Sequence, residues 1–304
     1  MTTKTAMITI AGRPNVGKST LTNKLTGEKI AIVTPKPQTT RNRIYGVFDY
    51  GDAQMILLDT PGYHNPRNRL GEYMVGIARE SVADVDAVAL IVEPVDNVGA
   101  QEDLLIGDVA RSGVPCILVI NKIDTIKVDL VLPIMETYSR RFGFDAIIPI
   151  SAKTGDGLPQ LLEALAAYAK TGPRLFPDGM ATDQPEKQII AEIIREKLLM
   201  YLDKEVPHGI AVEIMRFEQR GGQGGDDSEE GCIIDVEAAI YCEKNSHKGI
   251  IIGKNGVMLK RVGREAREDM ERFMGAKIYL QTWVKVRENW RDSKTMLKNF
   301  GYVK

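Results

Sequence analysis

The stretch GRPNVGKST, residues 12–20, decides what kind of fold this sequence can adopt. It matches the template G-x-x-x-x-G-K-[ST] and lies between the apolar run MITIAG (7–12) and a segment of helical periodicity (17–27). Its glycines let the backbone approach an anion closely, and the N–H groups of the loop and of the following helix attract phosphate. The sequence therefore predicts a phosphate-binding loop between a strand and a helix.

Short apolar runs alternate with helical patterns through the first half of the chain. The further runs are QMILLD, AVALIVE, PCILVIN and AIIPIS (54–59, 87–93, 115–121 and 146–151), apolar on both faces as buried parallel strands are. Helical spacing fills gaps at 70–83, 100–112, 129–142 and 157–169. This alternation predicts an α/β fold, with a mostly parallel sheet covered by helices on both faces and ligand loops at the carboxyl ends of its strands.

Length and composition fit a protein of two domains. The chain has 304 residues, of which 43% are hydrophobic and 27% charged, values ordinary for a globular protein. Its three cysteines form no C-x-x-C pair, which argues for a reducing compartment and against disulfides or a zinc site. The first residues do not resemble a signal peptide, and no later apolar run is long enough to cross a bilayer. We therefore expect a cytoplasmic protein.

A proline- and glycine-rich stretch, KTGPRLFPDGMATDQPE (170–186), interrupts the alternation. It predicts a first domain at 1–172, a linker at 173–186 and a second domain at 187–304. The second domain should contain a helix (186–202), two strands (209–219 and 232–243), a glycine-flanked turn (249–256), a basic helix (257–274), a third strand (276–286) and a short helical tail after it. The order helix–strand–strand–helix–helix–strand, in which the apolar lead-in to the turn counts as a helix, indicates a small α+β domain. The acidic, glycine-rich stretch at 220–231 should be a loop between the two strands.

Charge is divided unevenly between regions. Residues 244–304 hold 15 Lys and Arg against 6 Asp and Glu, whereas residues 186–243 hold 6 against 14. Most charge runs are solvated faces of helices, but an asymmetry this large favours a nucleic-acid partner for the C-terminal quarter.

The phosphate loop and the DTPG sequence at 59–62 together predict a nucleoside triphosphate site. Lys18 would bring a positive charge to the β and γ phosphates, and the Ser19 hydroxyl would ligate Mg²⁺. Asp59 would hold a metal-bound water, and the Gly62 N–H would reach the γ phosphate. In the segment VTPKPQTTRNR (33–43), a threonine that ligates Mg²⁺ only when the γ phosphate is present would act as a switch, and Thr39 and Thr40 are both candidates.

The NKID sequence at 121–124 predicts which base is bound. Guanine presents two adjacent donors, which the Asp124 carboxylate could accept together, whereas adenine presents an acceptor that Asp124 would repel. SAK (151–153) follows the next strand and would add a backbone contact to guanine O6, although a helix N-cap formed by Ser151 is an alternative of equal weight.

The second glycine-rich stretch, GIIIGKNG (249–256), fails the phosphate-loop template because only three residues separate its first two glycines. It contains instead the G-x-x-G turn with which KH domains clamp single-stranded RNA. Candidate RNA contacts are Gly253, Lys254, Asn255, Gly256, Lys260 and Arg261. Trp283 and Trp290 are candidates for stacking on bases, although a core position is favoured for Trp283.

Taken together, these motifs resemble the translation-factor-class GTPases of the Era family over essentially the whole chain. The resemblance implies a P-loop GTPase domain followed by a type II KH-like domain. It also implies slow GTP hydrolysis and binding near the 3′ end of 16S ribosomal RNA during 30S subunit assembly. A monomeric state and peripheral association with the inner face of the cell membrane are implied as well.

Site residues follow from the same resemblance. Thr40 matches the family's magnesium threonine, so the Mg²⁺ set is Ser19, Thr40 and Asp59. The implied catalytic residues are Asn15, Lys18, Thr40 and Gly62. The implied nucleotide contacts are Gly12, Asn15, Val16, Gly17, Lys18, Ser19, Thr20, Asp59, Gly62, Asn121, Lys122, Asp124, Ser151, Ala152 and Lys153.

One position departs from many GTPases. Tyr63 stands where a water-orienting glutamine is common, and His64 beside it is as well explained as a loop residue as a catalyst. In some relatives the asparagine that matches Asn15 helps to bind K⁺, which supplies positive charge during hydrolysis.

Two other functions stay open from sequence alone. One is a GTP-gated enzyme of tRNA modification, which would need nucleophilic or redox residues after 175, and none is visible. The other is a signalling switch whose C-terminal domain binds proteins.

Overall fold

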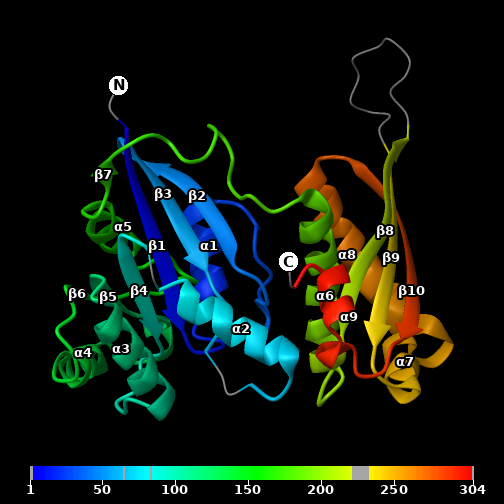
Figure 1. The fold of residues 1–304 in the computed structure, drawn as a ribbon, viewed down its shortest axis with the longest axis horizontal. Coiled ribbons are helices and arrows are strands. Elements are labelled where there is room, and N and C mark those ends of the chain that lie inside the picture. The colour runs from blue at the N-terminus through cyan, green and yellow to red at the C-terminus, as the bar shows by residue number, and fades with distance from the viewer. Residues whose placement is uncertain (1–2, 64–65, 83, 221–232, 303–304) are drawn as a thin grey trace, which may run out of the picture. The chain divides into compact units, whose positions relative to one another are not determined.

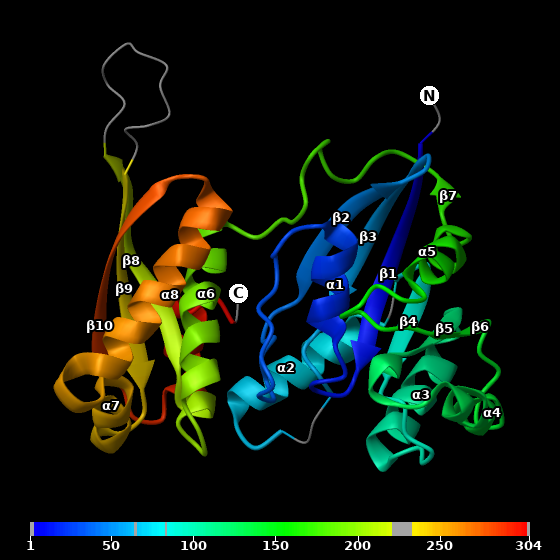
Figure 2. The same ribbon diagram turned by 180° about the vertical axis from the view of Figure 1, so that it is seen from behind.

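The computed structural model describes residues 3–63, 66–82, 84–220 and 233–302. Two compact units make up the chain: the larger one holds most residues up to Gln184, and the smaller one holds the residues from Pro185 onward and the short stretches 34–36 and 68–70 (Figures 1 and 2). Within the described residues, no helix is long and apolar enough to cross a membrane.

The larger unit is built on a mostly parallel sheet of the order β2-β3-β1-β4-β5-β6, with β7 antiparallel beside β1. All neighbours on the main path are parallel except β2 and β3. The strands are β1 (Lys4–Gly12), β2 (Ile44–Tyr50), β3 (Ala53–Asp59), β4 (Ala87–Val92), β5 (Cys116–Ile120), β6 (Ala146–Pro149) and β7 (Lys170–Thr171).

Helices cover both faces of this sheet. They are α1 (Lys18–Thr26), α2 (Arg69–Glu80), α3 (Ala100–Ser112), α4 (Val131–Ser139) and α5 (Leu158–Ala166). Ile8 and Ile10 of β1 pack in one core cluster with residues of α1 and α5, while Leu90 of β4 packs in another with residues of α2, α3 and α4. The α/β prediction is confirmed, and each predicted helix and strand of this half is present within a few residues of its expected bounds.

Two strands were not expected. β2 pairs antiparallel with β3 at the edge of the sheet, and the two-residue β7 pairs with β1. β2 carries polar and exposed positions among its apolar ones, because an edge strand next to solvent does not need apolar residues on both faces.

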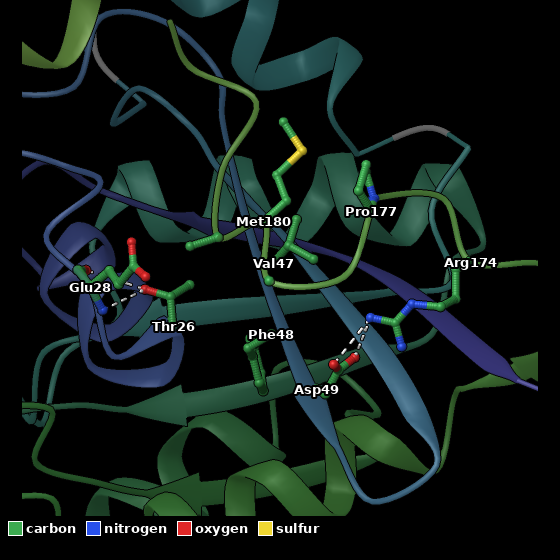
Figure 3. A pocket seen from close by; sticks show the side chains of 10 residues that line it. Thr26, Glu28, Val47, Phe48, Asp49, Arg174, Pro177 and Met180 are labelled. Atoms are coloured by element: carbon green, nitrogen blue, oxygen red, sulfur yellow. Dashed lines mark hydrogen bonds and ion pairs between the residues drawn. The ribbon is translucent and has the colours of Figure 1, made fainter. Parts of the chain in front are cut away.

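The stretch predicted as a linker packs onto β2 and β3. The buried side-chain amide of Gln54 accepts hydrogen bonds from the N–H groups of Leu175 and Phe176 (2.8 and 3.1 Å) and donates to the Phe176 carbonyl (2.9 Å). The Val47 N–H donates to the Ala181 carbonyl at 2.8 Å. This strap closes over a small hollow beside α1, where the Arg174 guanidinium donates to the Asp49 carboxylate (Figure 3).

The smaller unit is an α+β domain with the predicted order helix–strand–strand–helix–helix–strand. Its sheet has the order β10-β9-β8, with β9 antiparallel to β8 and parallel to β10. Residues of α6 and α8 pack with strand residues in one core cluster. The elements are α6 (Glu186–Tyr201), β8 (Ala211–Arg220), β9 (Ile233–Cys242), α7 (Asn245–Ile252), α8 (Val257–Met274), β10 (Lys277–Val286) and α9 (Lys294–Asn299). Apart from Arg220, the predicted loop at 220–231 lies outside the described residues.

The expected environment of the tryptophans is wrong. Trp283 on β10 is 43% exposed, whereas Trp290 is completely buried. The indole N–H of Trp290 donates to the Gly209 carbonyl at 2.9 Å, and its ring contacts Phe300 and Tyr302. Trp283 alternates with buried residues on an edge strand, so its side chain is on the face that the helices leave uncovered.

Candidate functional site

The glycine-rich loop at 12–19 connects β1 to α1 at the carboxyl edge of the sheet, where the loops after β3, β4 and β5 also begin. Gly17 has a φ of 102°, and a Cβ added there would lie 2.2 Å from the Nδ2 atom of Asn121. A Cβ at Gly12 would lie 2.4 Å from the Ile91 carbonyl oxygen. Both positions therefore need glycine for the loop to pack against the neighbouring strands.

The Lys18 side chain is held inside this loop. Its ammonium donates to the carbonyls of Gly12 (3.1 Å) and Arg13 (2.8 Å), and the side chain is almost fully buried. Burial lowers the pKa of Lys18 to about 8, and the Asp59 carboxylate opposes this effect. An anion bound at the loop would favour the charged form, because it would supply a counter-charge where water is excluded.

Three oxygen-bearing side chains from separate segments converge beside Lys18. The Ser19 hydroxyl donates to Asp59 Oδ2 at 2.7 Å and is 2.8 Å from the Thr40 hydroxyl. Burial raises the pKa of Asp59, while the Lys18 charge opposes the shift. Its Oδ1 atom is buried and has no hydrogen-bond partner among the described residues. Such an oxygen set with an unsatisfied buried carboxylate oxygen fits a small divalent cation. Of the two candidate threonines, Thr40 is the one bonded to Ser19.

The turn after β3 lies against the phosphate loop. A Cβ at Gly62 would lie 2.6 Å from the Pro14 nitrogen, so this contact also requires glycine. The next side chain, Tyr63, is buried and its hydroxyl donates to Asp108 at 2.6 Å while accepting from Arg79 Nε at 2.8 Å. Tyr63 is thereby bonded to α2 and α3. His64 lies outside the described residues.

The loops after β5 and β6 meet around Asn121. Its amide donates to the Val16 carbonyl at 2.8 Å and accepts from the Ala152 N–H at 2.9 Å. The Ser151 hydroxyl donates to Asp124 Oδ1 at 2.7 Å, and the Lys122 ammonium donates to the Asn15 carbonyl at 2.7 Å. The NKID and SAK segments are therefore joined to the phosphate loop. Two predicted contacts are placed less specifically: Thr20 is half-buried on α1, and Lys153 is exposed.

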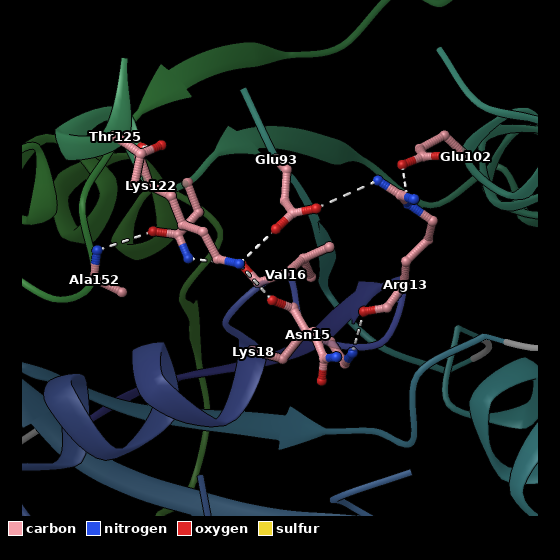
Figure 4. A network of polar contacts seen from close by, with 10 residues as sticks. Arg13, Asn15, Val16, Lys18, Glu93, Glu102, Lys122, Thr125 and Ala152 are labelled. Carbon is pink, nitrogen blue, oxygen red and sulfur yellow. Dashed lines mark hydrogen bonds and ion pairs between the residues drawn. The ribbon is translucent and has the colours of Figure 1, made fainter. Parts of the chain in front are cut away.

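A second polar network borders the phosphate loop, and the sequence did not indicate it. Arg13 forms ion pairs with Glu93 and with the buried Glu102 of α3, and Glu93 also accepts a hydrogen bond from Lys122 (Figure 4). The residue types alone resemble ordinary surface charges. The one available signal was the position of Glu93 directly after an apolar strand.

In the smaller unit, the G-x-x-G turn connects α7 to α8. Gly253, Asn255 and Gly256 have φ values of 72°, 53° and 76°. A Cβ at Gly253 would lie 2.7 Å from Met258 Cβ. The turn borders an open hollow of about 410 Å³ lined by Gly253, Lys254, Asn255, Val257, Met258 and Arg261.

Charge and apolar surface are combined at this turn. Lys254, Asn255, Lys260 and Arg261 are exposed, and Val257 is 65% exposed. The Arg261 guanidinium lies 4.0 Å from the centroid of the Tyr201 ring and donates to Glu265 at 3.2 Å. An exposed backbone turn with cations and an apolar side chain suits a sugar–phosphate chain whose bases need a surface to pack on.

Comparison with known proteins agrees with this arrangement. Residues 7–122 match the family model of a 50S ribosome-binding GTPase, and residues 205–291 match that of a KH domain. GTPase Era of Ruminiclostridium cellulolyticum is 49% identical over 99% of this chain and 98% of its own length. GTPase Era of Alkaliphilus oremlandii is 48% identical over 99% of this chain and its whole length.

This chain belongs to the Era family of GTPases.

Solved structures of the family extend the likeness to the whole fold. A crystal structure of Era in complex with MgGDPNP and nucleotides 1506–1542 of 16S ribosomal RNA has a TM-score of 0.92 at 36% identity, covering 99% of this chain and 100% of that one. A structure of an Aquifex aeolicus Era variant bound to GDP and AlF₄⁻ has a TM-score of 0.91 at 36% identity, with the same coverage. The predicted GTPase activity and the pairing of a GTPase domain with a KH domain are confirmed.

Proposed function

We propose that this GTPase binds Mg·GTP at the edge of its larger sheet and 16S ribosomal RNA at the G-x-x-G turn of its smaller unit, and that it assists assembly of the 30S subunit. The observation that carries the nucleotide part is the convergence of Ser19, Thr40 and Asp59 beside Lys18. The relative with the matching fold is bound to MgGDPNP and to RNA, which supports both parts.

The residues around the phosphate loop would divide the work of binding and hydrolysis. Backbone N–H groups of residues 15–20 and the Lys18 ammonium would hold the phosphates, since both present positive charge to the same anion. Mg²⁺ would be held by Ser19, Thr40 and a water on Asp59, and it supplies positive charge to the β and γ phosphates. The Gly62 N–H would contact the γ phosphate only in the GTP state.

Guanine would be recognised by the loops that surround Asn121. The Asp124 carboxylate, held by Ser151, would accept hydrogen bonds from both guanine donors. The backbone at Ala152, whose N–H donates to Asn121 in this structure, would lie near guanine O6. K⁺ near Asn15 would add positive charge during hydrolysis, in place of the glutamine that many GTPases carry at the position of Tyr63. The Tyr63 hydroxyl would not orient the attacking water, because it is already bonded to Asp108 and Arg79.

RNA would be held at the turn between α7 and α8. Lys254, Lys260 and Arg261 would attract phosphate, and Gly253, Asn255 and Gly256 would let the sugar–phosphate backbone approach. The alternative of a tRNA-modifying enzyme is disfavoured because residues 205–291 match a KH domain. A monomeric state and peripheral membrane association stay predictions, which sedimentation and vesicle flotation would test.

Two titrations test the proposal. Fluorescent GDP, GTP and ADP analogues should show tight, guanine-specific binding, and the GTP analogue should bind more weakly when Mg²⁺ is removed. A single-stranded RNA with the 3′ sequence of 16S ribosomal RNA should bind more tightly than its complement at equal salt concentration, since salt sets the electrostatic part of the affinity. Equal affinity for GDP and ADP would refute the nucleotide assignment, and equal affinity for both RNAs would refute the RNA assignment.

A further inference from the structure

Strand order places the end of β4 between the two halves of the nucleotide site. In the sheet, β4 lies between β1, which leads into the phosphate loop, and β5, which leads into the NKID sequence. Glu93 is the first residue after β4. A side chain at this position can therefore reach the phosphate loop on one side and the base-binding loop on the other.

Glu93 contacts a cation from each of these loops. One carboxylate oxygen accepts a hydrogen bond from the Lys122 ammonium, and the other lies 3.7 Å from Arg13 Nη2. Lys122 has a φ of 65° and donates at the same time to the Asn15 carbonyl at 2.7 Å. Lys122 therefore has a left-handed backbone, and its side chain is held by both the phosphate loop and Glu93 (Figure 4).

The Arg13 side chain is fixed from a second direction. Its Nε atom pairs with Glu102, which is 1% exposed and lies in the first turn of α3. The Arg13 carbonyl in turn accepts from the Lys18 ammonium at 2.8 Å. Glu102 therefore stabilises the part of the phosphate loop that orients Lys18, and Glu93 links that part to the base-binding loop.

We propose that Glu93 is a positioning residue for nucleotide binding, which acts through Lys122 and Arg13 to hold the guanine-binding loop and the phosphate loop in one arrangement. The inference rests on the proposed nucleotide site. Glu93 itself contacts neither phosphate nor metal in this scheme. Its removal takes the Glu93 counter-charge from Lys122, so the two loops keep their hydrogen bonds through Asn121 and Lys122 but lose the carboxylate that they share.

The expected effect lies in affinity and not in turnover. The Glu93 side chain is 33% exposed, so solvent screens its ion pairs and the loss is moderate. For Glu93→Ala we expect GDP to bind about threefold to tenfold more weakly, mostly through faster dissociation. The KM for GTP should rise by a similar factor, whereas kcat should change by less than about twofold, because an interaction of equal strength in ground and transition states affects binding alone. Glu93→Gln keeps the shape and one acceptor, so its loss should be smaller.

Titration of the full-length protein with a fluorescent GDP analogue tests this. Glu136→Ala is the matched control, because Glu136 is an exposed glutamate of α4 that pairs only with the exposed Arg140 among the ion pairs described. Its GDP affinity should equal that of the unmodified protein. Circular dichroism of each variant verifies the fold, and Glu93→Gln serves as the test should Glu93→Ala not fold.

Epistasis separates positioning from a general structural role. In a Lys122→Met background, Glu93→Ala should cause a clearly smaller further loss of GDP affinity than in the unmodified protein, because only the longer contact of Glu93 with Arg13 then remains. A full and additive loss in that background would overturn the proposal, as would unchanged affinity in Glu93→Ala. Asp124→Asn is measured beside these variants: if it loses GDP affinity while Glu93→Ala does not, the proposed nucleotide site stands and the inference about Glu93 fails.

Discussion

Adding one methyl group at Gly62 should slow GTP hydrolysis without weakening GDP binding. The added Cβ of Gly62→Ala would lie 2.6 Å from the Pro14 nitrogen, 2.7 Å from Pro14 Cα and 2.8 Å from Pro14 Cγ. The first two are backbone atoms of the phosphate loop, which cannot turn aside as a flexible side chain can. The variant must therefore separate the turn after β3 from the phosphate loop.

The size of the displacement follows from the contact distances. Relaxing a 2.6 Å contact to an ordinary 3.4 Å requires a shift of about 0.8 Å. A misplacement of this order in a reacting geometry lowers rates by about tenfold to a hundredfold. GDP affinity should stay within about threefold, because the proposed contact of the Gly62 N–H is with the γ phosphate, which GDP lacks.

The assay is single-turnover release of phosphate from GTP, measured beside a titration with a fluorescent GDP analogue. Gly76→Ala is the matched control: Gly76 lies in α2, and apart from its chain neighbours and the backbone of its own helix no atom of the described residues lies within 4 Å of an added Cβ, so hydrolysis should be unchanged. The control should also be slightly more stable, since alanine favours helix by about 0.5–1 kcal/mol over glycine. Normal hydrolysis in a correctly folded Gly62→Ala variant would refute the role given to this turn.

Three further predictions concern the base, a proton and a cation. Asp124→Asn should weaken GTP binding about tenfold or more and favour xanthosine triphosphate, whose carbonyl replaces the guanine amino group; unchanged GTP affinity would contradict the base assignment. Because burial lowers the pKa of Lys18 to about 8 and phosphate favours its charged form, GDP binding should take up about half a proton at pH 8 and almost none at pH 6.5. Calorimetry in two buffers of different ionisation enthalpy measures this proton uptake, and no uptake at pH 8 would argue against phosphate binding at Lys18. Hydrolysis should be faster in K⁺ than in Na⁺ at equal ionic strength and this difference should shrink in Asn15→Ala, whereas equal rates would remove the K⁺ site.

Motifs and periodicity predicted the parts of the fold whose physics is local. The glycines of the phosphate loop are needed for backbone geometry that any nucleotide site of this type shares, and the buried strands are apolar because helices cover both faces of the sheet. Ser19 and Asp59 followed from the same logic, because each is placed next to the end of a predicted element, whereas the choice of Thr40 over Thr39 came from the family resemblance. In the structure the Ser19 hydroxyl contacts both Thr40 and Asp59, and the metal set itself stays a prediction.

Features that depend on long-range packing were not predictable in the same way. The strap at 174–181 has the proline and glycine content of a linker, yet Gln54, more than a hundred residues earlier, binds its backbone. Trp290 lies in a polar tail but is buried by Phe300 and Tyr302. Trp283 lies in an apolar strand but on its uncovered face. Local sequence patterns depend on a residue's neighbours along the chain, whereas burial depends on its neighbours in space.

The central claim is that the two glycine-rich loops bind different ligands, nucleotide at 12–19 and RNA at 253–256. The most direct test replaces Lys254 and Asn255 together by Asp in the full-length protein and measures RNA binding and phosphate release in parallel. RNA affinity should fall by more than about tenfold, because two negative charges then face the phosphates. GTP hydrolysis in the absence of RNA should equal that of the unmodified protein. Retained RNA affinity, or a loss of nucleotide binding in its place, would contradict the account.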